Sequence, residues 1–318
     1  MLNLVYNEWI KIFKRAGSYV MIGLIILGVI GSGALTKYYE GKLDKGTQRD
    51  WKAEVTAEIK ADEQQLKEML ATAASAKKFY EKNIEINKYR LAHNMAPSDQ
   101  SSGFSFINDN TMFISFVGLF TIIIAAGIVA SEFSWGTIKL LLIRPLKRSK
   151  ILLSKYITVI VFGIFMLAIL FVTSAIVGFI LFGSGSGDNV HLAYTNGHVV
   201  EQNMLWYLIK TYLLSSIDVI MLITMAFMIS AVFRNSSLAI GISVFLLLMG
   251  GNITQLLAAK FEWAKFILFA NTNLMQYFDG IPLVEGMTLG FSIITLLVYF
   301  IIFIVLAFGV FMKRDVAA

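Results

Sequence analysis

The sequence predicts an all-α integral membrane protein with six transmembrane helices, and three observations carry that prediction. Of the 318 residues, 57% are hydrophobic and only 15% are charged, whereas about a quarter of the residues in a soluble domain are charged. Several apolar segments reach the roughly 20 residues that a helix needs to cross about 30 Å of hydrocarbon. Lys and Arg gather beside one set of segment ends, which is typical of a topology signal.

The apolar segments set the order of the elements along the chain. We predict transmembrane helices at residues 18–35, 111–130, 156–182, 205–233, 238–255 and 288–311. The fifth segment contains Gly250, Gly251 and Asn252. Because glycine weakens a helix interior, this span is the one expected to be short or broken.

The distribution of basic residues predicts the orientation of the spans. The connection 131–155 carries six Lys and Arg against a single acid, Glu132, while the outer loop predicted at 183–204 has no Lys or Arg. The positive-inside rule makes the basic side cytoplasmic, so both termini are expected in the cytoplasm. The net charge of +6 is therefore explained by topology, and nucleic acid is not expected as a partner.

Residues 1–17 predict an amphipathic elbow helix that lies in the headgroup plane before the first span. Its apolar face holds Leu2, Val5, Tyr6, Trp9, Ile12 and Phe13, and its polar face holds Asn3, Asn7, Lys11, Lys14 and Arg15. A cleaved signal peptide is the alternative, because a basic start, an apolar core and the small residues 31–34 also fit one.

Residues 36–110 predict a helical extracytoplasmic insertion between the first two spans. They contain 12 basic and 12 acidic residues, with apolar residues at helical spacing. We expect one long helix or a helical hairpin at 48–92. Two roles stay open for it, a solvated spacer or a lid or partner-binding module.

The segment 131–157 predicts a compact basic corner between the second and third spans. Ser131 is expected to cap a new helix, with Glu132 at its positive end, where a carboxylate is favoured. An apolar run follows, and Pro145 disfavours helix at Arg144 and so forces a turn. An ordinary basic loop is the simpler interpretation of the same residues.

This corner resembles the cytoplasmic segment of ABC-2 type permeases, the membrane subunits of ATP-binding-cassette exporters. The matching pattern is E-x3-GT-x7-P-x2-R-x6-K, formed by Glu132, Gly136, Thr137, Pro145, Arg148 and Lys155. An elbow helix, six spans and an aromatic-rich outer segment at 256–287 extend the resemblance along nearly the whole chain. In that family the outer segment forms short interfacial or re-entrant helices.

The resemblance implies that the corner is a coupling helix which docks on a separate ATPase chain. No phosphate-binding loop of the G-x4-GK-[ST] type occurs in the sequence, so ATP and Mg²⁺ would be bound by two ATPase subunits and no cofactor by this chain. The permease would be a homodimer or heterodimer in a bacterial plasma membrane. The expected coupling residues are Glu132, Trp135, Gly136, Thr137, Leu141, Leu142, Arg144, Pro145, Arg148 and Lys155.

Within that set we assign two kinds of contact. Trp135, Leu141, Leu142 and Pro145 would supply the packing surface. Arg144, Arg148 and Lys155 would form ion pairs with the partner or contact anionic headgroups.

Polar residues inside the spans mark a candidate transport path. Thr211, Ser215 and Asp218 fall at i, i+4 and i+7 on one helix face, and Asn252 and Gln255 end the fifth span. The stripe would line a path or hold a proton or cation, or it would be a structural seam between helices.

The remaining alternatives concern the kind of function. Export of a hydrophobic or amphipathic substrate, such as an antimicrobial peptide, leads over sodium or drug efflux and over a membrane sensor or scaffold. An intramembrane enzyme would need paired acids, clustered histidines or an activated serine, and only Asp218 stands in a span. With no cysteine and three scattered histidines, no metal site is expected.

Overall fold

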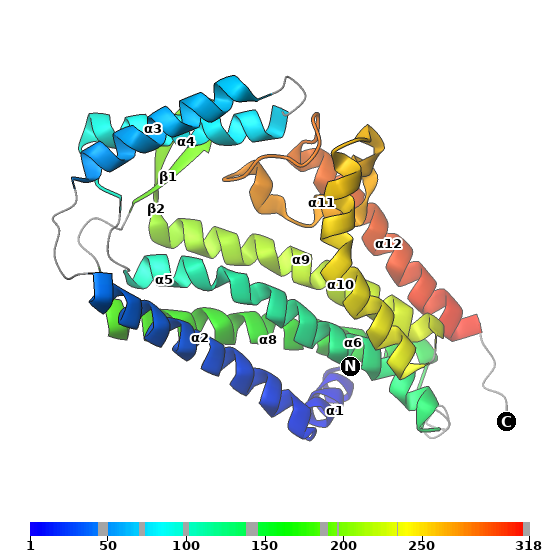
Figure 1. The fold of residues 1–318 in the computed structure, drawn as a ribbon. Helices are drawn as coiled ribbons and strands as arrows, with labels where there is room; N and C mark the ends of the chain where they lie inside the picture. Colours follow the sequence, from blue (N-terminus) through cyan, green and yellow to red (C-terminus); the bar gives the residue numbers. More distant parts are fainter. Residues whose placement is uncertain are drawn as a thin grey trace.

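The computed structural model describes residues 1–43, 50–69, 74–97, 102–137, 146–184, 190–195, 197–233 and 235–313. Six helical segments in this part of the chain are long and apolar enough to cross a membrane. Figure 1 shows them packed side by side. The prediction of a mostly helical, multi-pass membrane protein is confirmed. The segments are α2 (Ala16–Leu43), the run α5–η1–α6 (Gly103–Asp109, Asn110–Phe113, Ile114–Ser134), α8 (Arg148–Phe182), α9 (Met204–Phe233), α10 (Ser236–Ala258) and α12 (Leu289–Lys313).

Two spans differ from the sequence prediction. The second begins at Gly103 rather than at residue 111, and Ser102 starts it with a capping box to Ser105. The fifth, α10, runs unbroken from Ser236 to Ala258, so the expectation of a short or broken helix was wrong. Gly250 meets the ring of Phe269 there, since an added Cβ would lie 2.3 Å from Phe269 Cε2. This glycine permits close packing and does not interrupt the helix.

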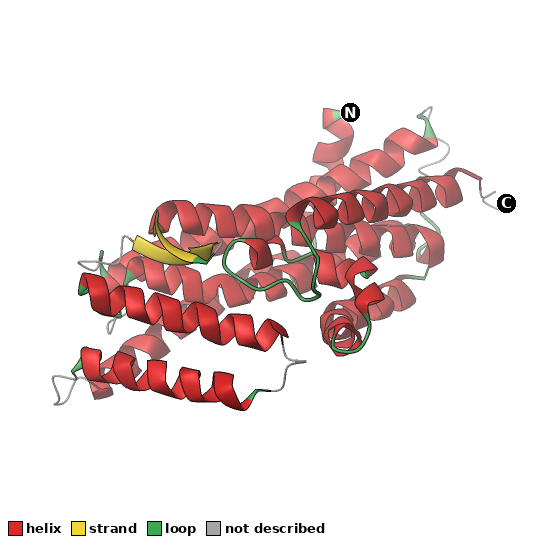
Figure 2. Ribbon diagram, turned by 90° about the horizontal axis from the view of Figure 1, so that it is seen from above, coloured by secondary structure: helices red, strands yellow, loops and turns green. Residues whose placement is uncertain are grey.

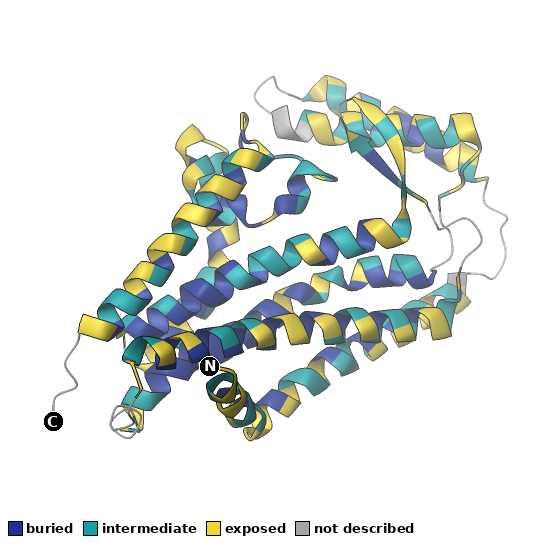
Figure 3. Ribbon diagram, turned by 180° about the vertical axis from the view of Figure 1, so that it is seen from behind, coloured by how far each residue is buried: buried dark blue, intermediate teal, exposed yellow. Residues whose placement is uncertain are grey.

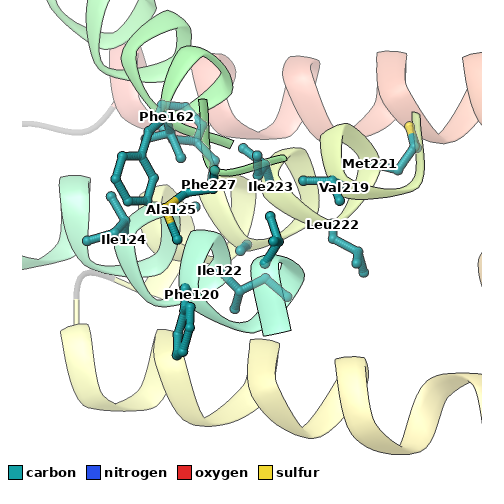
Figure 4. Packing of buried hydrophobic residues seen from close by; sticks show 14 of the residues in the cluster. Phe120, Ile122, Ile124, Ala125, Phe162, Val219, Met221, Leu222, Ile223 and Phe227 are labelled. Carbon is teal, nitrogen blue, oxygen red and sulfur yellow. The ribbon is translucent and has the colours of Figure 1, made fainter. Parts of the chain in front are cut away.

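The helices α6 and α9 form the centre of the bundle. Within the spans that contain them, 67% and 61% of the residues are buried, against 17% for α2, 22% for α10 and 17% for α12. Figure 3 shows the same contrast, and Figure 4 shows Phe120, Phe162 and Phe227 among the packed side chains of the core. The outer helices therefore face lipid or another chain.

The insertion after the first span is a helical hairpin, as one of the two predicted forms. Its helices are α3 (Trp51–Glu68) and α4 (Ala74–His93), which lie side by side in Figure 2. They pack through Val55, Ile59 and Ile84, a small apolar cluster separate from the bundle core.

The outer loop predicted at 183–204 contains a β-hairpin that the sequence analysis did not predict. Strand β1 (Val190–Thr195) pairs antiparallel with β2 (His198–Asn203), and Gly197 adopts a φ of +84° between them. This positive φ suits glycine in a tight turn. Both strands lie against α4 and the start of α9.

Short helices connect α10 to α12. They are η2 (Glu262–Phe266), α11 (Leu268–Asn271) and η3 (Leu274–Tyr277). Asn271 holds this outer segment together, because its amide donates to the Lys265 and Ile267 carbonyls and its oxygen accepts from Ser292. The segment therefore has a fixed shape between the two spans.

The elbow helix is α1 (Leu2–Phe13). Trp9 and Phe13 pack edge-on against Phe162 and Phe165 of α8. Its apolar face is thus partly covered by the bundle.

Candidate functional site

A buried lysine joins three helices at the end of the bundle where the chain begins. Lys155 on α8 has a side chain only 3% exposed, and its Nζ donates to Glu8 Oε2 and to Glu132 Oε1, both at 2.8 Å. Glu8 lies on α1 and Glu132 on α6. A buried charge is costly unless it is paired and hydrogen-bonded, and both conditions are met here.

Two more residues complete the arrangement. Lys11 Nζ lies 2.7 Å from Glu8 Oε1 and 3.5 Å from Glu132 Oε1. The hydroxyl of Thr137 donates to Glu132 Oε2. We call the five residues Glu8, Lys11, Glu132, Thr137 and Lys155 the Lys155 cluster. Its two ammonium groups balance its two carboxylates, so the cluster needs no outside counter-ion.

The helix that carries Glu132 runs further than the sequence analysis expected. Ser131 does not cap a new helix, because α6 continues to Ser134 and the Ser131 hydroxyl donates at 2.5 Å to the Gly127 carbonyl of its own helix. Such a bond to the carbonyl four residues back lets a serine stay inside a helix. Glu132 therefore sits at the negative end of α6, where Lys155 and Lys11 offset its charge.

The turn after α6 is built by Gly136. Its φ of +72° is a conformation that suits glycine at a helix C-terminus. Beside it Trp135 is 65% exposed, and the Arg15 guanidinium lies 5.1 Å from its ring centre. The turn thus presents an aromatic surface next to the elbow helix.

The predicted coupling residues fall into three groups in the structure. Glu132, Thr137 and Lys155 come together in the Lys155 cluster, so Lys155 is not available to headgroups or to a partner surface. Trp135 and Gly136 are exposed, and Arg148 is the first residue of α8. The others lie outside the described residues: Leu141, Leu142, Arg144 and Pro145.

Glu8 and Lys11 were not among the predicted site residues. Glu8 is the single acid in residues 1–17, and it stands beside Trp9 on the amphipathic helix. A lone acid on a basic helix was a signal that it had a partner elsewhere.

The polar stripe of α9 is covered by the outer segment. The Thr272 hydroxyl interacts with the Asp218 carboxyl, Met275 Sδ lies 3.8 Å from Thr211 Oγ1, and Asp279 Oδ2 accepts from the Tyr207 hydroxyl at 2.9 Å. As the number rises from 272 to 279, the contact on α9 falls from 218 to 207. The segment therefore runs antiparallel along the outer half of α9.

The other candidate path residues have different surroundings. Ser215 is half-buried on α9. Asn252 and Gln255 are exposed on α10, and the Asn252 amide donates to the Leu248 carbonyl of its own helix. Any path that these two amides line would lie outside a single copy of the bundle.

Comparison with known proteins places the chain in a family. Residues 70–317 match the model of a family described as a protein of unknown function, DUF2705. The chain belongs to the DUF2705 family. It is 52% identical over 319 residues to the uncharacterized protein YhcI of Bacillus subtilis (strain 168), with both chains covered completely. It is 36% identical over 200 residues to the uncharacterized membrane protein YdbK of the same organism, covering 62% of this chain and 76% of the relative.

The matched region contains most of the features described above. It includes α4, the β-hairpin, the outer segment and the five spans from α5 to α12, with Glu132, Thr137 and Lys155 among its residues. The similarity to a membrane protein agrees with the six apolar helices.

Proposed function

We propose that this chain is the permease subunit of an ATP-driven exporter of the ABC-2 type, with ATP hydrolysed by a separate chain. The observation that carries the proposal is the Lys155 cluster. The connection 131–155 leaves α6 beside Glu132 and returns into α8 at Lys155, and these two residues are ion-paired to each other at 2.8 Å and to the elbow helix. Both ends of the connection are thus fixed to the bundle.

Such an anchor gives the connection a mechanical role. A partner that pushed on the exposed surface around Trp135 would move α1, α6 and α8 together, because Glu8, Glu132 and Lys155 join them through buried charged hydrogen bonds. Rigid-body movement of helices is a common way to open one side of a membrane path and close the other.

The exposed outer helices support assembly into a pair of permeases. Asn252 and Gln255 lie on the exposed surface of α10, where polar side chains are disfavoured against lipid. A second copy of this chain, or a related permease, would cover them, and the path would then run between the two copies. Two ATPase subunits would complete the assembly on the side of the termini, which we place in the cytoplasm of a bacterium.

For the substrate we propose a hydrophobic or amphipathic molecule such as an antimicrobial peptide. The support is the low charge of the spans, which hold Asp218 but no second acid to pair with it. Sodium or drug efflux stays the alternative within the same kind of transporter.

Co-purification tests the partnership. The full chain, expressed in a Bacillus host with its genomic neighbours, should retain an ATPase through detergent purification, and Trp135→Ala should reduce the amount retained. Trp206→Ala is the matched control, because Trp206 is 70% exposed against 65% for Trp135 but lies at the start of α9. Wild-type chain that retains no ATPase, or equal loss in both variants, would overturn the proposal.

A further inference from the structure

One carboxylate at the outer end of the bundle joins four parts of the chain. Asp279, in the outer segment after η3, lies with Oδ1 2.8 Å from Lys82 Nζ of α4. Its Oδ2 accepts from the Tyr207 hydroxyl of α9 at 2.9 Å and lies 3.3 Å from His191 Nε2 of β1. Lys82 also donates to the Asp279 carbonyl. We call Lys82, His191, Tyr207 and Asp279 the Asp279 clasp.

The clasp is well ordered and remains ionised. The rings of His191 and Tyr207 stack at 3.6 Å, and the side chains of Lys82 and Asp279 are 17% and 21% exposed. Burial alone raises the pKa of Asp279, but the hydrogen bonds and charges of His191 and Lys82 outweigh it and hold the pKa at about 2. Asp279 is therefore a carboxylate near neutral pH.

The helical hairpin α3–α4 meets the bundle through polar contacts. Besides Lys82, Tyr89 of α4 donates to Glu201 Oε1 of β2 at 3.2 Å. The apolar cluster of Val55, Ile59 and Ile84 lies within the hairpin itself and does not join the bundle core. A docked element with a small polar contact area separates more readily than one that shares a core.

The position of the hairpin gives this separation a purpose. Figures 1 and 3 show α3 and α4 lying across the outer end of α9, over the β-hairpin. Asp279 ends the segment that runs along α9 from Asp218, so the clasp lies at the outer limit of the polar stripe.

We propose that the α3–α4 hairpin is a separable cover over the outer end of the bundle, and that Asp279 is the group that holds it shut. When Lys82 leaves Asp279, the cover lifts from the β-hairpin and exposes the outer end of α9. The use of this cover as an outer gate rests on the proposed transport function, whereas the opening itself does not.

Thiol labelling tests the opening directly, because the natural sequence has no cysteine. Leu192 of β1 is a suitable reporter. It is 9% exposed and stands opposite Glu201, which meets Tyr89 of α4, so it lies on the strand face toward the cover. The Leu192→Cys chain in detergent would react slowly with a hydrophilic maleimide at pH 7.

The variants are chosen within the same helix. Lys82→Met in the Leu192→Cys chain should raise the labelling rate about tenfold or more, because a hydrogen bond to a charged group is lost. Lys88→Met is the matched control, since Lys88 also lies on α4 but is within 4 Å only of Glu63 and Glu85 of the same hairpin. It should leave the rate nearly unchanged.

A second set of chains separates opening from misfolding. Asp279→Asn should raise the rate as Lys82→Met does, and the double variant should add little, because both break one contact. Ala226→Cys, at a site 0% exposed in α9, should stay unlabelled with or without Lys82→Met. Equal rates in the wild type and Lys82→Met, or an equal rise with Lys88→Met, would overturn the proposal. These measurements need no ATPase, so they succeed or fail independently of the transport function.

Discussion

Lys155 Nζ lies 2.8 Å from Glu8 Oε2, although 147 residues separate them in the sequence. The contact ties the elbow helix to the start of the third span. Together with Glu132 it turns three helix ends into one unit. The basic connection 131–155 is thus anchored by a buried ion pair at its own ends.

Replacing Lys155 should be strongly destabilising. Lys155→Met leaves Glu8 and Glu132 with only part of their positive charge, and breaking a buried pair typically costs about 3–5 kcal/mol. We expect the free energy of unfolding in detergent to fall by about that amount, measured by thermal or denaturant unfolding.

Lys150→Met provides the comparison, because Lys150 lies on the same helix and is exposed. Its effect should stay within about 0.5 kcal/mol, as for most surface substitutions. Adding Glu132→Gln to Lys155→Met should cost less than the sum of the two single changes. Equal effects of Lys155→Met and Lys150→Met would show that the cluster contributes nothing to stability.

The spans could be predicted because each is specified by its own residues. Hydrophobic length alone locates a segment such as 156–182, and the structure has helix there. Helical spacing likewise predicted helix within 48–92. The break expected at Gly250 was wrong because a glycine's effect depends on what it packs against, and Phe269 is remote in sequence.

The polar sites could be predicted only in part. Glu132, Thr137 and Lys155 were singled out, but their mutual contact was not expected. A lysine beside a span end reads the same whether it points to headgroups or to a buried acid, and Glu8 decides which. Asp279 and Lys82, separated by 197 residues, carry no local pattern that would join them.

Gly250→Ala should loosen the outer segment. The added methyl group would meet Phe269 at 2.3 Å, and overpacking of this kind typically costs about 1–3 kcal/mol. Thermal unfolding in detergent measures the loss. Gly251→Ala is the neighbouring control, because an added Cβ there has no atom within 4 Å, and it should be neutral or stabilise the helix by up to about 1 kcal/mol. Phe269→Leu should restore part of the stability of Gly250→Ala; no restoration would contradict the assigned contact.

Asp218→Asn should separate function from folding. The amide can still interact with the Thr272 hydroxyl, so we expect unfolding to change by no more than about 1 kcal/mol. In the reconstituted complex with its ATPase, stimulated ATP turnover should fall more than the amount of complex does. Thr272→Val is the companion variant. If Asp218→Asn lowers stability, assembly and turnover equally, the stripe is a structural seam.

Acid should release the hairpin cover only well below neutral pH. The pKa of Asp279 is lowered from 3.8 to about 2, so its contribution to docking is complete above the ordinary value and is lost as pH falls through the lowered one. Lys82 and His191 lose no positive charge in acid. Pepsin cleavage within α3–α4 should therefore be slower in the wild type than in Asp279→Asn near pH 5, and the ratio should approach one near pH 2. The ratio isolates Asp279 from other carboxylates such as Glu201. A ratio that already reaches one at pH 5 would show that Asp279 does not hold the cover.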